Sequence, residues 1–334
     1  MKMKFCCVFY LLLILFLMAG SCGDSGTQPP EKKELEIAWK KIGLDSLIVY
    51  TVATSPEGTV FVGSDGKIFR SADHGETWQM VASSSVRDFY FSEFSLGYAT
   101  ISQDGILQST DDGRSWERIF IKELRDDINS VAFAPNGYVY LGSVHHDESA
   151  GGIIKSTDRG TTWERTTYPD TLGAEILIIT DTNRILTSGD GGILLSDDDG
   201  QTWNESRQGF RIHSGEISYA FSSAVDPIFK DIYVALDLDG VYKSTDNGST
   251  WTPFNQMEID VSRIKMSKNG FIFIVREDVR RAYYSSVEGG EWLDLTPDIP
   301  DIIVAYGGLA IDAVGYIYLG TTQGIYRSEK PILK

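Results

Sequence analysis

The sequence has few cysteines, and all of them lie close to the N-terminus. Its 334 residues contain three, namely Cys6, Cys7 and Cys22, so no disulfide can join two parts of the chain beyond residue 22. Basic residues are also outnumbered, with 30 Lys and Arg against 47 Asp and Glu and a net charge of −17. Nucleic-acid binding needs a basic footprint that this composition does not provide. We therefore expect a fold held by its hydrophobic core, with no nucleic-acid partner.

Motifs of the common enzyme classes are missing as well. The chain has no nucleophile elbow, phosphate-binding loop, dinucleotide fingerprint, zinc-ligand spacing or EF-hand loop. The segment Asp197-Asp-Asp-Gly200 is similar to part of a calcium loop, but the distal Glu of such a loop does not follow it. We expect neither a metal nor a cofactor.

The long apolar run of the chain lies at its N-terminus. Two lysines precede an almost unbroken apolar stretch from Val8 to Met18, and small residues follow it up to Cys22. A basic start, a short apolar core and small residues are typical of a signal peptide, and the core is too short to span a membrane. We predict a signal peptide over residues 1–21 and a polar, Pro-containing tether over residues 22–36.

The segment Ala19-Gly-Ser-Cys22 resembles the cleavage site of bacterial lipoproteins. In those proteins the Cys is acylated and becomes the first mature residue. The resemblance implies an exported protein whose lipidated Cys22 anchors it to the bacterial cell envelope or the outer-membrane surface. The alternative is an ordinary secretory signal in which Cys22 has no special role.

An octapeptide of the pattern Ser-x-Asp-x-Gly-x-Thr-Trp recurs along the rest of the chain, with Ser for Thr in one copy. The Asp can accept hydrogen bonds from its own turn, the Gly supplies a positive φ, and the Trp packs against neighbouring structure. We therefore interpret the aspartates as structural. Five well-kept copies contain Asp73, Asp111, Asp158, Asp198 and Asp246, and a degenerate sixth copy spans residues 285–292.

The spacing of these copies predicts the fold class. Each copy follows three short apolar strands separated by turns, and its Trp begins a fourth, giving about forty residues per unit. The last unit, 302–328, has three strands, whereas Ala38–Ile42 reads as a fourth strand without a unit. We predict an all-β fold over residues 37–334. It is a seven-bladed β-propeller of four-stranded antiparallel blades, closed by the N-terminal strand pairing into the C-terminal blade, with six or eight blades as alternatives.

The octapeptide resembles the Asp-box, or BNR repeat, of sialidase-like, sortilin-like and photosystem II assembly factor-like propellers. The resemblance implies that these turns lie away from the ligand-binding face and that loops on the other face carry the function. It does not choose among functions, because one scaffold serves many.

We expect a non-catalytic, surface-anchored and monomeric module that binds a protein or a glycan. The alternative is a sialidase-like or xyloglucanase-like glycoside hydrolase. Sialidases carry an early Phe/Tyr-Arg-Ile/Leu-Pro segment, and here only Phe210-Arg-Ile-His213 comes close, in mid-chain and without the Pro. Xyloglucan-cleaving enzymes of this kind usually carry two propellers, twice the length available here.

Candidate ligand-face residues come from loops that are long or basic. The alternative for each loop is a plain solvated segment, and for the arginine cluster it is local pairing with Glu277 and Asp278. The candidates are His145, His146, Asp147, Glu148, Arg211, His213, Arg276, Arg280 and Arg281.

Overall fold

The chain folds into short β-strands. The computed structural model describes residues 35–334 apart from 94–95, 102–104, 122–126, 145–150, 170–171, 190–191, 214, 216, 238, 256–259, 277, 297–298, 300–302 and 333–334. Within this described part there are 28 strands and no helix, so no helix there could span a membrane. Residues Ile37–Lys334 form one compact unit. The predicted signal peptide and Cys22 lie outside the described residues.

Five of the sheets in this unit have four antiparallel strands each, and each sheet is one blade. In chain order these blades are β6 (Val86–Phe91), β7 (Gly97–Ile101), β8 (Ile106–Ser109) and β9 (Glu117–Ile119); β10 (Ile128–Phe133), β11 (Val139–Ser143), β12 (Gly152–Ser156) and β13 (Glu164–Arg165); β14 (Leu177–Ile179), β15 (Ile185–Gly189), β16 (Gly192–Ser196) and β17 (Asn204–Ser206); β18 (Ala220–Val225), β19 (Ile232–Leu236), β20 (Gly240–Ser244) and β21 (Thr252–Phe254); and β22 (Val261–Met266), β23 (Phe271–Arg276), β24 (Arg281–Ser286) and β25 (Leu293–Asp294).

The sixth sheet has eight strands and contains both ends of the unit. Its order is β1-β28-β27-β26-β2-β3-β4-β5. The strands are β1 (Trp39–Lys41), β2 (Val49–Thr54), β3 (Val60–Ser64), β4 (Lys67–Ser71), β5 (Gln79–Ala82), β26 (Val304–Ile311), β27 (Ile317–Thr321) and β28 (Gly324–Ser328). Strand β1 pairs antiparallel with β28, with Trp39 opposite Ser328. The predicted pairing of the N-terminal strand with the C-terminal strands is therefore confirmed.

The predicted count of seven separate four-stranded blades is wrong in this form, because five such blades are separate and the other eight strands share a sheet. The two halves of that sheet meet at one parallel pair, Thr51 of β2 with Gly307 of β26. A Cβ on Gly307 would lie 2.9 Å from both the Thr51 hydroxyl and the Tyr50 carbonyl oxygen. Glycine is thus what lets these two backbones approach closely enough to pair.

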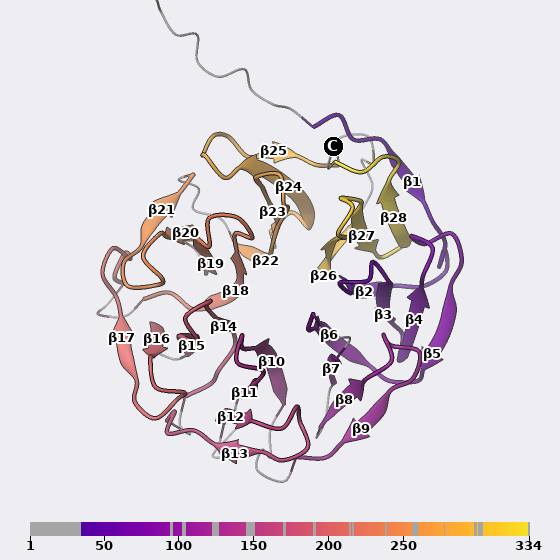
Figure 1. The fold of residues 1–334 in the computed structure, drawn as a ribbon. Coiled ribbons are helices and arrows are strands. Elements are labelled where there is room, and N and C mark those ends of the chain that lie inside the picture. The colour runs from indigo at the N-terminus through magenta and orange to yellow at the C-terminus, as the bar shows by residue number, and fades with distance from the viewer. Residues whose placement is uncertain are drawn as a thin grey trace, which may run out of the picture. The chain divides into compact units, whose positions relative to one another are not determined.

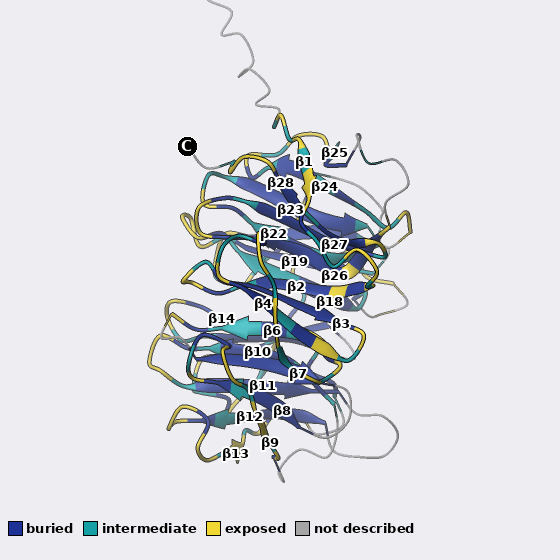
Figure 2. Ribbon diagram, turned by 90° about the vertical axis from the view of Figure 1, so that its right-hand side faces the viewer, coloured by how far each residue is buried: buried dark blue, intermediate teal, exposed yellow. Residues whose placement is uncertain are grey.

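The sheets surround a central axis (Figure 1), with the first strand of each group of four innermost. The second strands β3, β7, β11, β19 and β27 are buried along their whole length, which explains their apolar sequences without polar alternation. Outer strands such as β9 and β13 are largely exposed (Figure 2). The hydrophobic clusters join neighbouring groups of four strands; Tyr98 of β7, for example, packs with Leu141 of β11, and Val52 of β2 packs with Tyr318 of β27.

The five well-kept octapeptides form the turns between third and fourth strands, and they share one hydrogen-bond pattern. In the first copy the Ser71 hydroxyl donates to Asp73 Oδ1 at 2.7 Å and accepts from the Gly75 amide at 2.8 Å. The Thr77 amide and hydroxyl donate to the two oxygens of Asp73 at 2.9 and 2.6 Å. The hydrogen bonds that Asp73 accepts lower its pKa to about 2, and the bond from the Thr77 side chain has the largest effect. The aspartate thus completes its own turn.

The fourth residue of each octapeptide contacts the preceding group of strands. Its φ is positive in all five copies, between 55° and 62°, and the Gly follows it. This conformation directs Asp112 to the Ser55 and Thr59 hydroxyls at 2.7 and 2.6 Å, and Asp199 to the Tyr140 hydroxyl at 3.4 Å. The turns therefore connect successive blades as well as successive strands.

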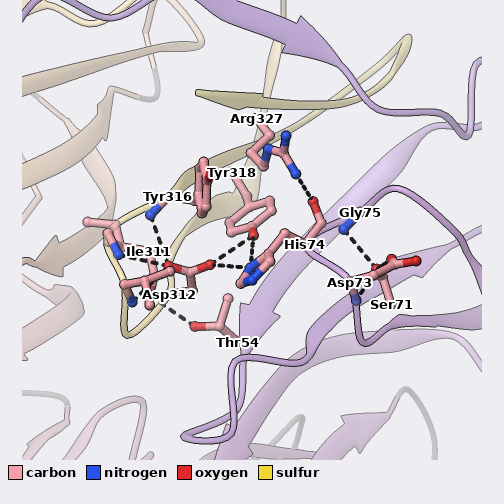
Figure 3. A network of polar contacts seen from close by, with 12 residues as sticks. Thr54, Ser71, Asp73, His74, Gly75, Ile311, Asp312, Tyr316, Tyr318 and Arg327 are labelled. Carbon is pink, nitrogen blue, oxygen red and sulfur yellow. Dashed lines mark hydrogen bonds and ion pairs between the residues drawn. The ribbon is translucent and has the colours of Figure 1, made fainter. Parts of the chain in front are cut away.

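In the eight-stranded sheet the same contact joins the two ends of the unit (Figure 3). His74 Nδ1 lies 3.0 Å from Asp312 Oδ2, and the Tyr318 hydroxyl donates to the same oxygen at 2.9 Å. Arg327 donates to the His74 carbonyl oxygen at 2.5 Å. The degenerate copy is connected differently, because the Asn255 side chain, just after β21, donates to Ser285 Oγ at 2.7 Å and accepts from the Gly290 amide at 2.9 Å. The buried hydroxyl of Tyr233, which corresponds to Tyr318, has no hydrogen-bond partner of ordinary geometry among the described residues.

Candidate functional site

Strand direction assigns the loops of the unit to two faces. Because the strands within each group are antiparallel, the start of each first strand lies at the same face as the turn between its second and third strands. The octapeptide turns between third and fourth strands lie at the opposite face. The first of these faces, which we call the loop face, therefore carries no octapeptide.

A cavity of about 1190 Å³ opens among the first strands. Its lining comes from the first strands, including most of β6 and β22 (Ser85–Tyr90 and Ser262–Lys265), and from second-to-third turns such as Asp65–Gly66. The turns and the starts of these strands lie at the loop face, so the cavity opens at that face, and Tyr90 and Lys265 lie further along their strands. A concave site of this size is the usual place for a ligand.

A repeated β-bulge shapes the lining. In five first-to-second strand pairs the register shifts at the second residue of the first strand. A bulge re-aims a side chain and is common beside functional sites. The five extra residues all line the cavity, and they are Tyr50, Arg87, Asn129, Phe221 and Ser262.

Exposed aromatic rings belong to this lining. Tyr50, Phe221 and Tyr306 are 50%, 42% and 47% exposed. The guanidinium of Arg280 lies 4.0 Å from the centre of the Tyr306 ring and donates to the Val304 carbonyl oxygen at 3.1 Å. Exposed rings gathered in one concavity provide an apolar, cation-bearing surface suited to binding.

A buried ion pair lies deeper in the cavity. Arg263 Nη1 on β22 is 2.5 Å from Asp88 Oδ2 on β6. Asp88 Oδ1 also accepts from the Phe89 amide at 2.8 Å and from the Thr51 hydroxyl at 3.3 Å. Burial would raise the pKa of Asp88, but attraction to Arg263 and then Lys265 outweighs it and lowers that pKa. Asp88 is therefore held as a carboxylate.

Lys265 lies two residues beyond Arg263 on the same strand and also lines the cavity. Burial, followed by repulsion from Arg263, lowers the pKa of Lys265 to about 8. The Tyr90 hydroxyl donates to the Asn129 carbonyl oxygen at 2.8 Å, and burial, then Asp88, raises the Tyr90 pKa well above its usual value. The deep part of the cavity thus combines a fixed carboxylate, a guanidinium and an amine.

Hydrogen bonds connect cavity side chains of β6 and β10 and of the segment just before β14. Arg87 Nη1 donates to Asn129 Oδ1 at 2.8 Å, and Asn129 Nδ2 donates to Glu175 Oε2 at 2.9 Å. Arg87 also pairs with Asp127. These contacts preorganise one side of the cavity wall.

Two predicted candidates, Arg211 and His213, converge on a buried carboxylate outside this lining. His213 Nε2 lies 2.8 Å from Asp239 Oδ2, and Arg211 Nη1 lies 3.4 Å from Asp239 Oδ1. The Ser218 hydroxyl donates to Asp239 Oδ2 at 2.6 Å. Asp239 therefore holds this loop in place.

The three candidate arginines of the basic cluster separate in the structure. Arg280 lines the cavity. Arg276 pairs with Asp278 at 2.6 Å, which is the local pairing considered as the alternative. Arg281 donates to the Thr296 carbonyl oxygen and pairs with Asp294 at 3.2 Å. The four candidates His145, His146, Asp147 and Glu148 lie outside the described residues.

Sequence reasoning missed the deep cavity residues Asp88, Arg263 and Lys265. A signal for them exists in the segment Val261-Ser-Arg-Ile-Lys-Met266, where two cations alternate with apolar residues in a strand of an otherwise buried frame. Charged residues at inward positions are rare unless they are paired or functional. The pattern alone did not show that Asp88, from another blade, faces them.

A glycoside hydrolase is the enzymatic alternative for this cavity. Such an enzyme needs one carboxyl group with a raised pKa and a second carboxylate across a cleft. Asp88 is bonded to Arg263 and has a lowered pKa, so it does not suit the acid role. In the described part of the chain, no group of three His, Cys, Asp or Glu could hold a metal ion.

Comparison with known proteins finds similarity in structure alone. No family model and no curated protein matches the chain. YCF48 from Cyanidioschyzon merolae is 14% identical over 87% of this chain and 98% of its own, with a TM-score of 0.63. A streptogramin B lyase is 13% identical over 88% and 97%, with a TM-score of 0.67. PorZ, a surface component of the type-IX secretion system of Porphyromonas gingivalis, is 15% identical over 84% and 46%, with a TM-score of 0.64.

These neighbours show that the chain is an all-β propeller. Identities of 13–15% carry nothing finer than the fold. The chain spans nearly all of YCF48 and of the lyase but less than half of PorZ. The neighbours include a lyase as well as a propeller bound to D1 peptide and a surface component, so they do not decide whether this protein is an enzyme.

Proposed function

We propose that this protein is an exported binding module whose central cavity receives a segment of a partner protein. The observation that carries the proposal is the cavity itself, which lies at the loop face and combines exposed aromatic rings with Arg263, Lys265 and Arg280. Rings supply contact area at low entropic cost, and buried cations favour an acidic group on the ligand. A glycan bearing a carboxylate is the second candidate, because the same rings and cations would suit it.

The charge of the protein as a whole supports an acidic ligand group at this place. The chain is strongly acidic, yet the cavity lining includes four cations, Arg87, Arg263, Lys265 and Arg280, against Asp65, Asp88 and Glu175. A locally cationic concavity on an acidic protein would orient a ligand that carries both an apolar part and an anionic end.

The structural neighbours support a binding role by analogy. One structure of YCF48 is bound to D1 peptide, and PorZ is described as an essential bacterial surface component. Analogy of fold is a weak argument by itself. It agrees here with a cavity whose fixed carboxylate, Asp88, is neutralised by Arg263 and is not set up as a general acid.

The proposal includes export, a lipid on Cys22 and membership of the Asp-box propellers. The signal-like N-terminal sequence supports the first two. The five turns with the same hydrogen bonds support the third. In this arrangement the tether 22–36 would hold a monomeric propeller at the envelope surface with its cavity free for a partner.

Site-specific photo-crosslinking tests the proposal. A photoreactive amino acid at Phe221, in the cavity, should yield a discrete crosslinked partner in cells of the native host. The matched control is Phe229, which is 68% exposed in the turn between β18 and β19 at the opposite face. Crosslinks from Phe229 and none from Phe221 would assign partner binding to the face opposite the loop face and would refute the proposal. The Tyr50→Ser/Tyr306→Ser variant should reduce crosslinking from Phe221.

A further inference from the structure

Lys265 differs from the other described lysines in its surroundings. Lys265 is only partly exposed to solvent. Even so, no hydrogen bond or ion pair joins its amine to any described residue. Lys243 provides the contrast, because its Nζ lies 2.7 Å from Asp231 Oδ2. A buried amine without a counter-ion is expensive to keep protonated, and burial therefore favours its neutral form.

The geometry explains why Asp88 does not serve Lys265 as a counter-ion. Asp88 Oδ2 is bonded to Arg263 at 2.5 Å, and Asp88 Oδ1 accepts from an amide and a hydroxyl. Both oxygens are thus engaged. Arg263 and Lys265 lie two residues apart on β22, so both side chains project to the same side of the strand. The guanidinium adds repulsion to the cost of burial.

Other charged and titratable groups line the same cavity on neighbouring elements. Tyr90 of β6 is bonded to the Asn129 carbonyl oxygen, and Glu175, before β14, accepts from Asn129. Arg280, after β23, stacks on Tyr306 of β26. Of the three carboxylates in this lining, Asp88 is bonded to Arg263, Glu175 to Asn129 and Asp65 to the Tyr50 hydroxyl, so none of them forms an ion pair with Lys265.

We infer that Lys265 is a reactive amine that forms a reversible imine with a small aldehyde or 2-oxo acid entering the central cavity. A lysine that is desolvated and lies beside another cation is the arrangement that makes an amine nucleophilic near neutral pH. The lowered pKa, about 8, agrees with this geometry. The inference goes beyond the proposed function and does not depend on a macromolecular partner.

The reaction balances without an oxidant or a reductant. The Nζ lone pair of neutral Lys265 attacks the carbonyl carbon, and a proton passes from nitrogen to oxygen to give a carbinolamine. Loss of one water from the carbinolamine forms the C=N bond. Addition of water reverses the sequence, so the product is a reversible covalent complex. An acid group on the carbonyl compound would be attracted by the cations of the cavity.

Reductive trapping tests the inference. The intact purified protein is incubated with glyoxylate, or with uncharged propanal, and cyanoborohydride between pH 6 and pH 10, and the labelled lysines are identified by peptide mass spectrometry. At pH 8 we expect Lys265 to be labelled on the order of tenfold faster than Lys243, because a larger fraction of its amine is neutral. The pKa of Lys243 is raised, since Asp231 outweighs the effect of its burial. The neutral fraction of the Lys265 amine, and with it the rate of imine formation, should level off about one pH unit above its pKa of about 8.

Two variants should shift the midpoint of the pH profile of Lys265 labelling in opposite directions. A lysine that is labelled only because it is exposed would show no such shifts. Asp88→Asn removes a carboxylate that favours the ammonium form, so the midpoint of the pH profile should fall. Arg263→Gln frees Asp88 to pair with Lys265, so the midpoint should rise. Thermal melting curves establish whether each variant is folded. The comparison of Lys265 with Lys243 labelling in the wild-type protein tests the inference even if a variant does not fold. Equal labelling of Lys265 and Lys243 at pH 8 would overturn the inference, and Lys265 would then be an ammonium that only attracts anions.

Discussion

His74 Nδ1 and Asp312 Oδ2 lie 3.0 Å apart, although 238 residues separate them in the chain. The first octapeptide turn thereby contacts the β26–β27 turn of the last strands, at the face opposite the loop face. The side chain of Asp312 is fully buried, and its other oxygen accepts from the amides of Val314, Gly315 and Tyr316. One carboxylate therefore satisfies a turn at the end of the chain and joins it to the beginning.

Asp312→Ala should destabilise the fold strongly. It leaves three amides and the Tyr318 hydroxyl without their acceptor in a buried position, which should cost on the order of 3 kcal/mol of unfolding free energy. Urea unfolding followed by tryptophan fluorescence measures this. The control is Asp181→Ala, since Asp181 is exposed and its pair with Lys230 spans 3.7 Å, so a change below about 0.5 kcal/mol is expected. Equal effects of the two substitutions would contradict the role of Asp312.

A matched pair of tyrosines tests the connecting role of the octapeptide turns. Tyr318→Phe removes a 2.9 Å bond to Asp312 and should lower the unfolding free energy by about 1.5 kcal/mol. Tyr233→Phe removes a buried hydroxyl that has no hydrogen-bond partner of ordinary geometry among the described residues, so stability should stay the same or rise slightly. The same urea titration measures both. A larger loss for Tyr233→Phe would show that the degenerate turn is not the weaker connection.

The octapeptide aspartates should make stability fall in acid. Hydrogen bonds lower the pKa of Asp73, Asp158 and Asp198 to about 2. In each copy the largest effect comes from the side chain of the octapeptide's Thr, which is Thr77 in the first copy. An unfolded aspartate titrates near about 3.9. Their contribution is therefore complete above about pH 4 and is lost as the pH falls toward 2. Thermal unfolding between pH 2 and pH 5 should show this loss.

The triple substitution of these aspartates by Asn provides the comparison for the acid titration. Asn keeps an acceptor but cannot titrate, so the variant should be less stable near pH 5 and less dependent on pH below 4. A pH dependence unchanged from the wild type would assign the acid loss to other groups.

Cys22→Ala tests the predicted anchor. If Cys22 carries a lipid, the wild-type protein should sediment with membranes and be released by detergent, whereas the variant should lose its acyl label and most of its membrane association. Cys6→Ala, inside the predicted signal peptide, is the control and should leave the fractionation unchanged. Membrane association of Cys22→Ala equal to that of the wild type would refute lipid anchoring at this residue.

Much of the fold follows from the sequence for local reasons. The octapeptide carries its own hydrogen-bond acceptor, its positive-φ glycine and its aromatic anchor, so each turn can be recognised from eight residues. The strands follow from the apolar segments between these turns, and the surplus strand at the N-terminus indicated its pairing with the C-terminal strands. The joining of eight strands in one sheet could not be read in this way, because it depends on the approach of Gly307 to Thr51 across the unit.

The candidate site was less accessible to sequence reasoning than the fold. Arg276, Arg280 and Arg281 are neighbours in sequence, yet only Arg280 lines the cavity, because alternate positions and turns direct their side chains differently. Arg211 and His213 were predicted as candidates because they lie on a long loop, but both are paired with Asp239 outside the cavity lining. The residues that distinguish the cavity lie within regular strands, where a charged residue looks like an ordinary exposed position.

The sequence by itself determined the repeat, the turns and the all-β class, because these depend on interactions within a few residues. Only the tertiary structure decided that Asp88 faces Arg263 from another blade, and that Lys265 lies beside this pair with no counter-ion of its own among the described residues. The physical reason is that burial and electrostatic partnership are properties of groups brought together in space. Here those groups lie 175 residues apart in the chain.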